Sequence, residues 1–173
     1  MKKRFGGPAI CLDRNDINTD EIIPAKYLTE NSKEALKPFM LEDLNLEGFD
    51  CASEKMRNAK VIVTRANFGC GSSREHAVWV FEVNGINMVI AESFARIFRQ
   101  NMFNCGLLAV ELKKAEIDQI FELCGDLEVE VDGAELKVRG NGRELSFSFE
   151  LNRFDHDLVT AGGWLQYANQ KYS

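Results

Sequence analysis

The sequence predicts an α/β fold built on a mixed sheet flanked by helices, and two changes of pattern along the chain lead to this prediction. From position 59 onwards, apolar runs of strand length alternate with segments of helical period, which is typical of parallel strands joined by right-handed crossovers. After position 126 the period becomes two, around the turns "DG" and "GNG", which is typical of antiparallel hairpins. With 173 residues and no repeat or clear internal boundary, we expect one domain over 1–173.

The amino-terminal third is expected to hold one strand and a long connection. A short apolar run near 9–12 predicts the strand, and an Asp-rich loop follows it. Residues 29–58 are charged and irregular and contain Pro38, so short helical turns are expected there. Connections of this length in a compact domain are often functional.

The regular part of the chain predicts three strand and helix pairs. Apolar runs place strands at 59–66, 86–93 and 107–112. Helical patterns place helices at 72–85, 94–106 and 114–124, the first two closed by glycine. The alternating hairpin region covers 126–150, and a last helix is expected at about 155–170.

Composition and charge exclude several classes of function. The net charge is −6 and the pI about 5.1, which disfavours nucleic acid or an anionic membrane as the main partner. The basic start lacks the apolar stretch of a signal peptide, and no segment has the roughly 20 apolar residues of a membrane span. We therefore expect a cytoplasmic protein.

The cysteines and histidines do not predict a metal site within this chain. The five cysteines are odd in number and never spaced as CxxC, so neither a disulfide framework nor a self-contained zinc or iron–sulfur site is expected: Cys11, Cys51, Cys70, Cys105 and Cys124. Only two histidines are present, His76 and His156.

The stretch "NFGCGSSREHA" at 67–77 is the strongest candidate for chemistry. It follows a predicted buried strand, and we expect its serines to begin a helix whose free N–H groups attract anions. Gly69 and Gly71 allow close approach of a ligand, and the planar fork of Arg74 suits a carboxylate or phosphate. The alternative is an ordinary glycine turn with a serine cap.

Known nucleotide and hydrolase motifs do not fit this stretch. No GK[ST] follows the glycines, and GxSxG is absent, so neither a P-loop nor a nucleophile elbow is present. Cys70 has no assignable His or Asn partner, and we interpret it as a structural thiol.

Two further segments carry polar residues that the pattern alone leaves ambiguous. In "DRNDINTDEIIPAKYL" the four acidic residues suit either turns and caps or the orientation of a catalytic group, and they lack calcium-loop spacing. In "ESFARIFRQNMFNCG" we interpret Ser93 as a helix cap and favour packing and a solvated face for the rest, including Arg96, Arg99, Asn101 and Asn104.

Taken together, "DINTDEIIPAKYL", "NFGCGSSREHA" and "VIAESFARIFRQNMFNCGL" closely resemble the small subunits of 3-isopropylmalate dehydratases. The motifs occur in the order of that family and span most of residues 8–112. The resemblance implies a swivelling β/β/α domain of the aconitase C-terminal type, acting in leucine biosynthesis as part of a hydro-lyase. The implied reaction removes water from a hydroxy acid and adds it back through an alkene.

The resemblance also implies partners and roles. A [4Fe-4S] cluster is expected on a separate large subunit, in a heterodimer or heterotetramer, with no cofactor in this chain. Ser72 matches the base that takes the carbon-bound proton, and Ser73 and Arg74 match carboxylate-binding positions. A helix N-terminus and Arg74 are expected to supply the positive field that a serine base needs.

Substrate choice is implied to depend on Leu28 and Thr29. Relatives that accept an extra carboxylate carry an arginine after the "YL" pair, and this chain has threonine there. This favours a substrate with an apolar branch, such as isopropylmalate, although a dimethylmalate fits as well and Lys26 is an alternative anion ligand. The remaining alternatives are a homoaconitase small subunit and a non-catalytic anion-binding module of the same fold.

Overall fold

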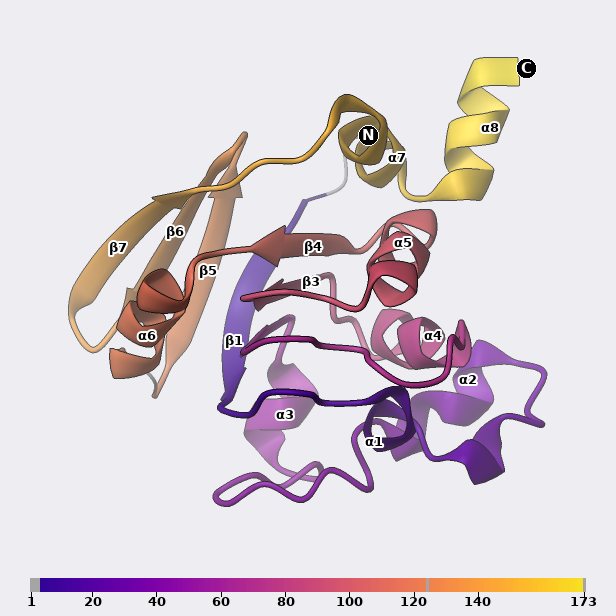
Figure 1. Ribbon diagram of the computed structural model, residues 1–173, viewed down its shortest axis with the longest axis horizontal. Coiled ribbons are helices and arrows are strands. Elements are labelled where there is room, and N and C mark those ends of the chain that lie inside the picture. Colours follow the sequence, from indigo (N-terminus) through magenta and orange to yellow (C-terminus); the bar gives the residue numbers. More distant parts are fainter. Residues whose placement is uncertain (1–3, 124, 173) are drawn as a thin grey trace.

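A single seven-stranded mixed sheet runs through the computed structural model, which describes residues 4–123 and 125–172 (Figure 1). The strands are β1 (Gly6–Leu12), β2 (Val61–Thr64), β3 (Met88–Ala91), β4 (Leu108–Glu111), β5 (Leu127–Asp132), β6 (Glu135–Gly140) and β7 (Arg143–Ser148). Their order in the sheet is β4-β3-β2-β1-β5-β6-β7. Strands β1 to β4 are parallel, and β5 to β7 join them as an antiparallel extension of β1. The predicted mixed α/β sheet is confirmed.

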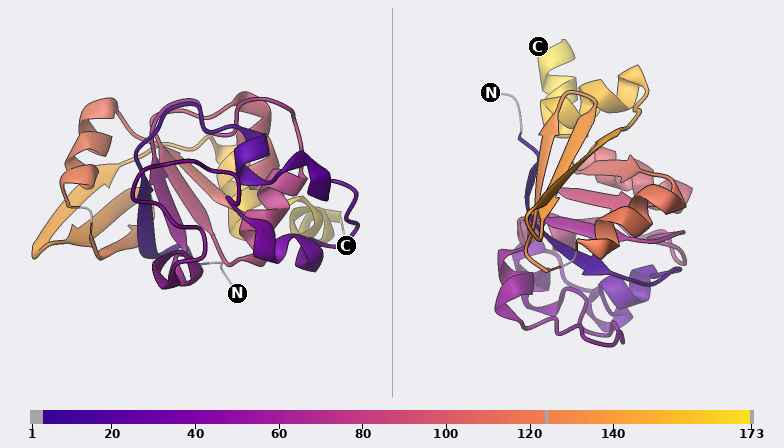
Figure 2. Two further views of the ribbon diagram at one scale, coloured as in Figure 1. Left: turned by 90° about the horizontal axis from the view of Figure 1, so that it is seen from below. Right: turned by 90° about the vertical axis from the view of Figure 1, so that its left-hand side faces the viewer.

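The sheet is accompanied by eight α-helices among the described residues, and each parallel strand is followed by at least one of them. They are α1 (Thr19–Ile22), α2 (Lys33–Leu36), α3 (Glu54–Asn58), α4 (His76–Val83), α5 (Arg96–Asn104), α6 (Lys114–Glu122), α7 (Arg153–Ala161) and α8 (Trp164–Tyr172), with 3₁₀ turns η1 (Ala25–Tyr27) and η2 (Lys37–Phe39). The central strands β2 and β3 are buried along their whole length, because helices cover the parallel part of the sheet. In Figure 2 the β5–β7 end of the sheet extends away from α4 and α5.

The carboxyl-terminal helix differs from its prediction. One helix was expected at about 155–170, but α7 ends at Gly162, which has a φ of +99°, and α8 starts at Trp164. A Cβ on Gly163 would lie 2.5 Å from the carbonyl oxygen of Asn104, so the break lets this turn pack against the end of α5. Gly163 is therefore required by tertiary contact, and Gly162 by its positive φ.

One cysteine also differs from expectation. Cys11 in β1 takes part in a disulfide, which spacing along the sequence could not reveal. Cys51 and Cys70 are free thiols, and Cys124 lies outside the described residues. None of the described helices has the length and apolar character required to span a membrane.

Candidate active site

The carboxyl ends of the parallel strands bring the predicted loops together at one edge of the sheet. Residues 13–18 follow β1, residues 65–75 follow β2, and residues 92–95 follow β3. Isolated parallel bridges join Asn18 to Cys70 and Phe68 to Phe94. In open α/β sheets ligands bind at this edge, so the fold places the candidate segment where a site is expected.

The segment containing Ser72 is held by the loop after β1. The Gly69 amide donates to the Ile17 carbonyl at 2.8 Å, and the Thr19 amide donates to the Cys70 carbonyl at 2.9 Å. The hydroxyl of Thr19, which is 1% exposed, donates to the Ser72 carbonyl at 2.9 Å. The backbone on both sides of Gly71 is therefore fixed by residues more than 50 positions earlier.

The serines do not begin a helix, so that expectation is wrong. Helix α4 begins at His76, with Glu75 as an N-cap that makes no side-chain bond. Gly71 has a φ of +94°, and the Ser72 carbonyl accepts a hydrogen bond from the Thr19 hydroxyl. The loop therefore continues past the serines. Ser72 lies four residues before the first residue of α4 and not in its first turn.

Arg74 is paired across the same two loops. Its Nη1 lies 2.5 Å from Oδ1 of Asp20, in the first turn of α1, and the Arg74 side chain is 20% exposed. The pairing orients the guanidinium and offsets part of its charge. Ser72 and Ser73 lie beside it and are exposed.

A cavity of about 610 Å³ lies between this segment and α5. Its lining residues are Thr19, Gly69, Gly71, Ser72, Ser73, Arg74, Ala95, Arg96, Ile97, Phe98, Gln100 and Asn101. The structure thus brings Ser72, Ser73 and Arg74 onto one wall. The opposite wall comes from a segment in which packing was favoured over function.

The α5 wall adds groups that the sequence interpretation missed. Arg96 and Gln100 are exposed at the cavity, and Ile97 is 56% exposed at its rim. Arg96 has no ion pair among residues 4–123 and 125–172. The signal that could have found them is position, because α5 follows β3, the strand next to β2, and therefore begins at the same sheet edge.

Close packing of α5 on the glycine loop sets the width of the cavity. A Cβ on Gly69 would lie 2.2 Å from Cγ of Phe98, which is 3% exposed. Ser93 was expected to cap α5, but the residue at the N-cap is Ala95. The Ser93 Oγ instead accepts a hydrogen bond of 2.8 Å from the backbone N–H of Asn67. Ser93 therefore ties the loop after β3 to the glycine loop.

Leu28 and Thr29 are not among the lining residues of this cavity. They follow η1, where the ring of Tyr27 stacks on Phe39 at 3.8 Å. The next residue, Glu30, links them to the start of α4, because its carbonyl lies 3.3 Å from Nε2 of His76. Lys26 Nζ lies 5.1 Å from the Tyr27 ring centroid and does not line the cavity either.

Cys70 has the properties of a structural thiol. Burial raises the pKa of the Cys70 thiol, and the negative charge of Asp16 acts in the same direction. A raised pKa keeps the group protonated at neutral pH, where a thiol is a poor nucleophile. This supports the interpretation made from the sequence.

The acidic residues after β1 serve as anchors between loops. Glu21 pairs with Arg14 and accepts from the Asn18 amide at 3.2 Å, completing a capping box on α1. Burial alone would raise the pKa of Glu21, but these two hydrogen bonds lower it below its ordinary value. Asp16 accepts a bond of 2.9 Å from the Asn67 side chain.

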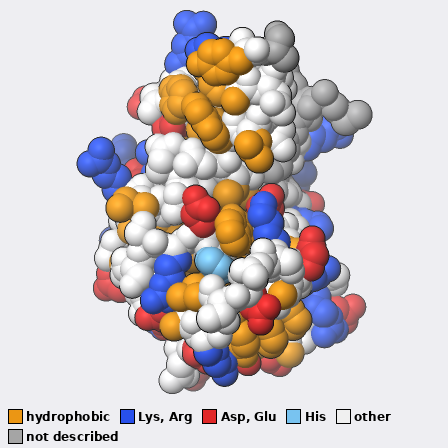
Figure 3. Space-filling view, turned by 90° about the vertical axis from the view of Figure 1, so that its right-hand side faces the viewer, with side chains coloured by type: hydrophobic (Ala, Val, Ile, Leu, Met, Phe, Trp, Pro, Cys, Tyr) orange, Lys and Arg blue, Asp and Glu red, His pale blue; other side chains and the backbone are white. Residues whose placement is uncertain are grey.

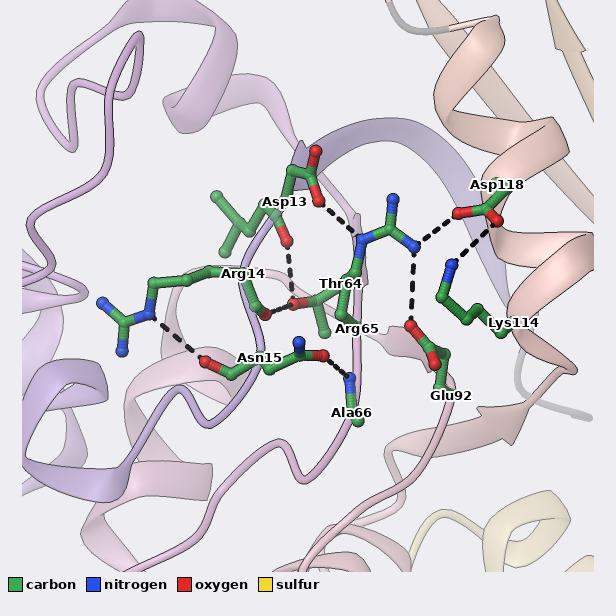
Figure 4. A network of polar contacts seen from close by, with 10 residues as sticks. Asp13, Arg14, Asn15, Thr64, Arg65, Ala66, Glu92, Lys114 and Asp118 are labelled. Carbon is green, nitrogen blue, oxygen red and sulfur yellow. Dashed lines mark hydrogen bonds and ion pairs between the residues drawn. The ribbon is translucent and has the colours of Figure 1, made fainter.

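Arg65 connects the ends of three strands to α6 (Figure 4). Its guanidinium lies 2.6 Å from Asp13, 2.6 Å from Asp118 and 3.5 Å from Glu92. Burial would lower the pKa of Arg65, but the bonds from Asp13 and Asp118 raise it, so the group stays charged. Because its side chain is only 16% exposed, this network positions the loops behind the cavity.

No group of three or more His, Cys, Asp and Glu side chains in the described part of the chain is arranged to hold a metal ion.

The chain is similar to several known proteins. The Aconitase C-terminal domain family matches residues 13–115. The chain is 40% identical over 154 residues to the 3-isopropylmalate dehydratase small subunit 2 of Deinococcus radiodurans, covering 89% of this chain and 71% of that protein. It is 38% identical to the small subunit from Deinococcus deserti over 154 residues, covering 89% and 81%. A crystal structure of 3-isopropylmalate dehydratase from Methanocaldococcus jannaschii superposes with a TM-score of 0.78 at 30% identity, covering 98% of this chain and 95% of that one.

Proposed function

The chain belongs to the family of 3-isopropylmalate dehydratase small subunits, which carry the aconitase C-terminal domain, and we propose that it supplies one wall of that enzyme's active site. The reaction is the exchange of 2-isopropylmalate and 3-isopropylmalate by loss and return of water, in leucine biosynthesis. The observation that carries the proposal is the cavity with Ser72, Ser73 and Arg74 on one side and α5 on the other. The proposal covers residues 1–173 as one domain with a cytoplasmic location.

Ser72 is the proposed base. Its Oγ takes the carbon-bound proton as the alkene forms and returns it in the reverse direction. A serine alkoxide needs positive charge nearby. The guanidiniums of Arg74 and Arg96 line the same cavity and are the candidates for that charge, in place of the helix N-terminus expected from the sequence.

Ser73 and Arg74 are the proposed carboxylate ligands. A guanidinium binds a carboxylate through two parallel hydrogen bonds, and the bond to Asp20 holds that of Arg74 in a fixed orientation. A hydroxyl on the adjacent residue adds a further donor. Together they fix the substrate with its reacting carbon toward Ser72.

A large subunit is the proposed partner that closes the cavity and carries the [4Fe-4S] cluster. When bound, the cluster supplies a Lewis acid for the departing hydroxyl. Two observations support the partner: the lining side chains Ser72, Ser73 and Arg96 are exposed, and Ile97 is 56% exposed at the rim. An apolar side chain at the edge of a polar cavity suits an interface.

The proposed test is reconstitution with the large subunit of the same organism. Ser72→Ala should lower kcat by about 10²- to 10⁴-fold, the usual contribution of a general base. Ser146→Ala, on exposed β7, is the control and should keep full activity. Full activity in Ser72→Ala would exclude this serine as the base.

Leu28 and Thr29 are proposed to favour a substrate with an apolar branch. Turnover should be compared for 2-isopropylmalate, 2,3-dimethylmalate and a homologous tricarboxylate. Thr29→Arg should raise the relative turnover of the tricarboxylate, because it supplies the missing cationic partner. An unchanged ratio would show that these residues do not contact the variable group.

A further inference from the structure

A second cavity, of about 710 Å³, adjoins the catalytic one (Figure 1 shows α5 beside α7 at this end of the molecule). Its lining residues are Phe94, Arg96, Arg99, Gln100, Phe103, Glu111, Asn152, Arg153, Phe154 and Asp155. They come from α5, the end of β4 and the first turn of α7. Arg96 and Gln100 line both cavities.

Three arginines surround this space in a chain whose net charge is −6. Arg96 and Arg153 are exposed and make no ion pair among the described residues. The Nε of Arg99 is buried without a hydrogen-bond partner, and its nearest carboxylate oxygen, on Glu111, lies 3.8 Å away. A buried donor without a partner is costly, which is consistent with a ligand on this side chain.

The two carboxylates of the lining leave Arg96 and Arg153 without an ion pair among the described residues, although Glu111 forms one with Arg99. Asp155 is 5% exposed, and its carboxylate accepts a bond of 2.8 Å from the Asn152 side chain. Its position in the first turn of α7 also places it near the positive end of that helix. Oε1 of Glu111 lies 3.8 Å from Nε of Arg99, which is longer than a hydrogen bond.

We propose that this cavity binds a small dicarboxylate with an apolar substituent, at a site separate from Ser72 and Arg74. Arg99 and Arg153, on two facing helices, bind the carboxylates through paired hydrogen bonds. The ring of Phe154, which is 48% exposed, provides apolar surface for the substituent. Because Arg96 lies on both cavities, a ligand bound here is in electrostatic contact with the catalytic cavity.

The test uses the isolated full-length chain and isothermal titration with 2-isopropylmalate and with malonate, so it does not depend on the proposed catalytic function. Arg99→Gln and Arg153→Gln should each weaken binding about tenfold or more, the loss of one charge-assisted pair. Phe154→Ala should weaken the binding of 2-isopropylmalate but not the binding of malonate. Arg139→Gln is the matched control, because that arginine is exposed and already paired with Glu130 and Glu144.

Arg74→Gln separates the two cavities and should leave binding unchanged. Binding lost in Arg74→Gln and retained in Arg153→Gln would place the ligand in the catalytic cavity and overturn the proposal. Absence of binding up to about 10 mM would also overturn it. Thermal melts of each variant exclude unfolding as the cause, and Arg153, being exposed, is the variant least affected by it.

Discussion

The side-chain hydroxyl of Thr19 donates a hydrogen bond of 2.9 Å to the backbone carbonyl of Ser72, 53 positions later in the chain. Thr19 is almost fully buried in the first turn of α1, whereas Ser72 is exposed to the cavity. A rigid, buried side chain thus holds the backbone of a residue in an exposed loop. Such fixation is what a proton transfer over a short distance requires.

Thr19→Val should lower activity more than stability. The valine keeps the shape of the side chain and removes the hydroxyl, so the free energy of unfolding should fall by only about 1 kcal/mol. Misplacement of Ser72 should lower kcat of the reconstituted enzyme about tenfold or more. Thr64→Val is the control, because that buried hydroxyl bonds to the Leu12 and Arg14 carbonyls and Thr64 does not line the cavity. This variant should lose stability, and its kcat should be unchanged. Equal kcat in both variants would contradict this role of Thr19.

Arg65→Met should destabilise the fold by about 2 kcal/mol, because it leaves the largely buried Glu92 carboxylate without a cation. Arg139→Met is the matched control: its guanidinium also contacts two carboxylates but is 48% exposed, and the change should cost less than about 0.5 kcal/mol. Urea denaturation of the isolated chain measures both. Equal effects would show that Arg65 contributes only as a surface charge.

The sequence predicted the order of elements well because their patterns are local. Apolar runs of four residues identified β2 and β3, and the change to a period of two identified the hairpins β5 to β7. The segment around Ser72 was predicted to form half of an active site, which stays a prediction, and the structure places it along one cavity at the sheet edge.

What the sequence could not predict depends on contacts between distant residues. The start of α4 at His76 follows from the bond between Thr19 and Ser72, which no local pattern encodes. The break between α7 and α8 follows from the contact of Gly163 with Asn104. Arg96 joins the cavity only because α5 packs tightly on the glycine loop. In the sequence alone, the residues of α5 resembled those of an ordinary packed helix.

Stability should fall in acid partly through Glu21. Its pKa is lowered in the folded state by Arg14 and the Asn18 amide, in spite of burial, so its contribution is present above the ordinary pKa of about 4.3. It is lost as the pH falls through the lower, folded-state value. Glu21→Gln should therefore flatten the dependence of the thermal midpoint on pH below about 4. Glu34→Gln, an exposed residue of α2, should leave the curve unchanged, and a parallel shift of the Glu21→Gln curve would contradict the linkage.

Gly69 and Gly71, the two glycines of the loop before Ser72, should respond differently to substitution by alanine. Both have positive φ, +82° at Gly69 and +94° at Gly71, so each substitution strains the backbone. At Gly69 the new Cβ would also lie 2.2 Å from Phe98 Cγ, whereas at Gly71 the nearest atom is 3.5 Å away. Gly69→Ala should therefore cost about 2 kcal/mol more than Gly71→Ala, because overpacking adds to backbone strain.

Urea denaturation and activity should be measured together for these two variants. Gly69→Ala pushes α5 away from the loop, so it should lower both stability and kcat. Combining it with Phe98→Leu should recover part of the activity lost in Gly69→Ala, because the smaller side chain frees the space that the methyl group needs. If Gly71→Ala proves the more destabilising change, the close packing of Phe98 on Gly69 does not set the width of the cavity.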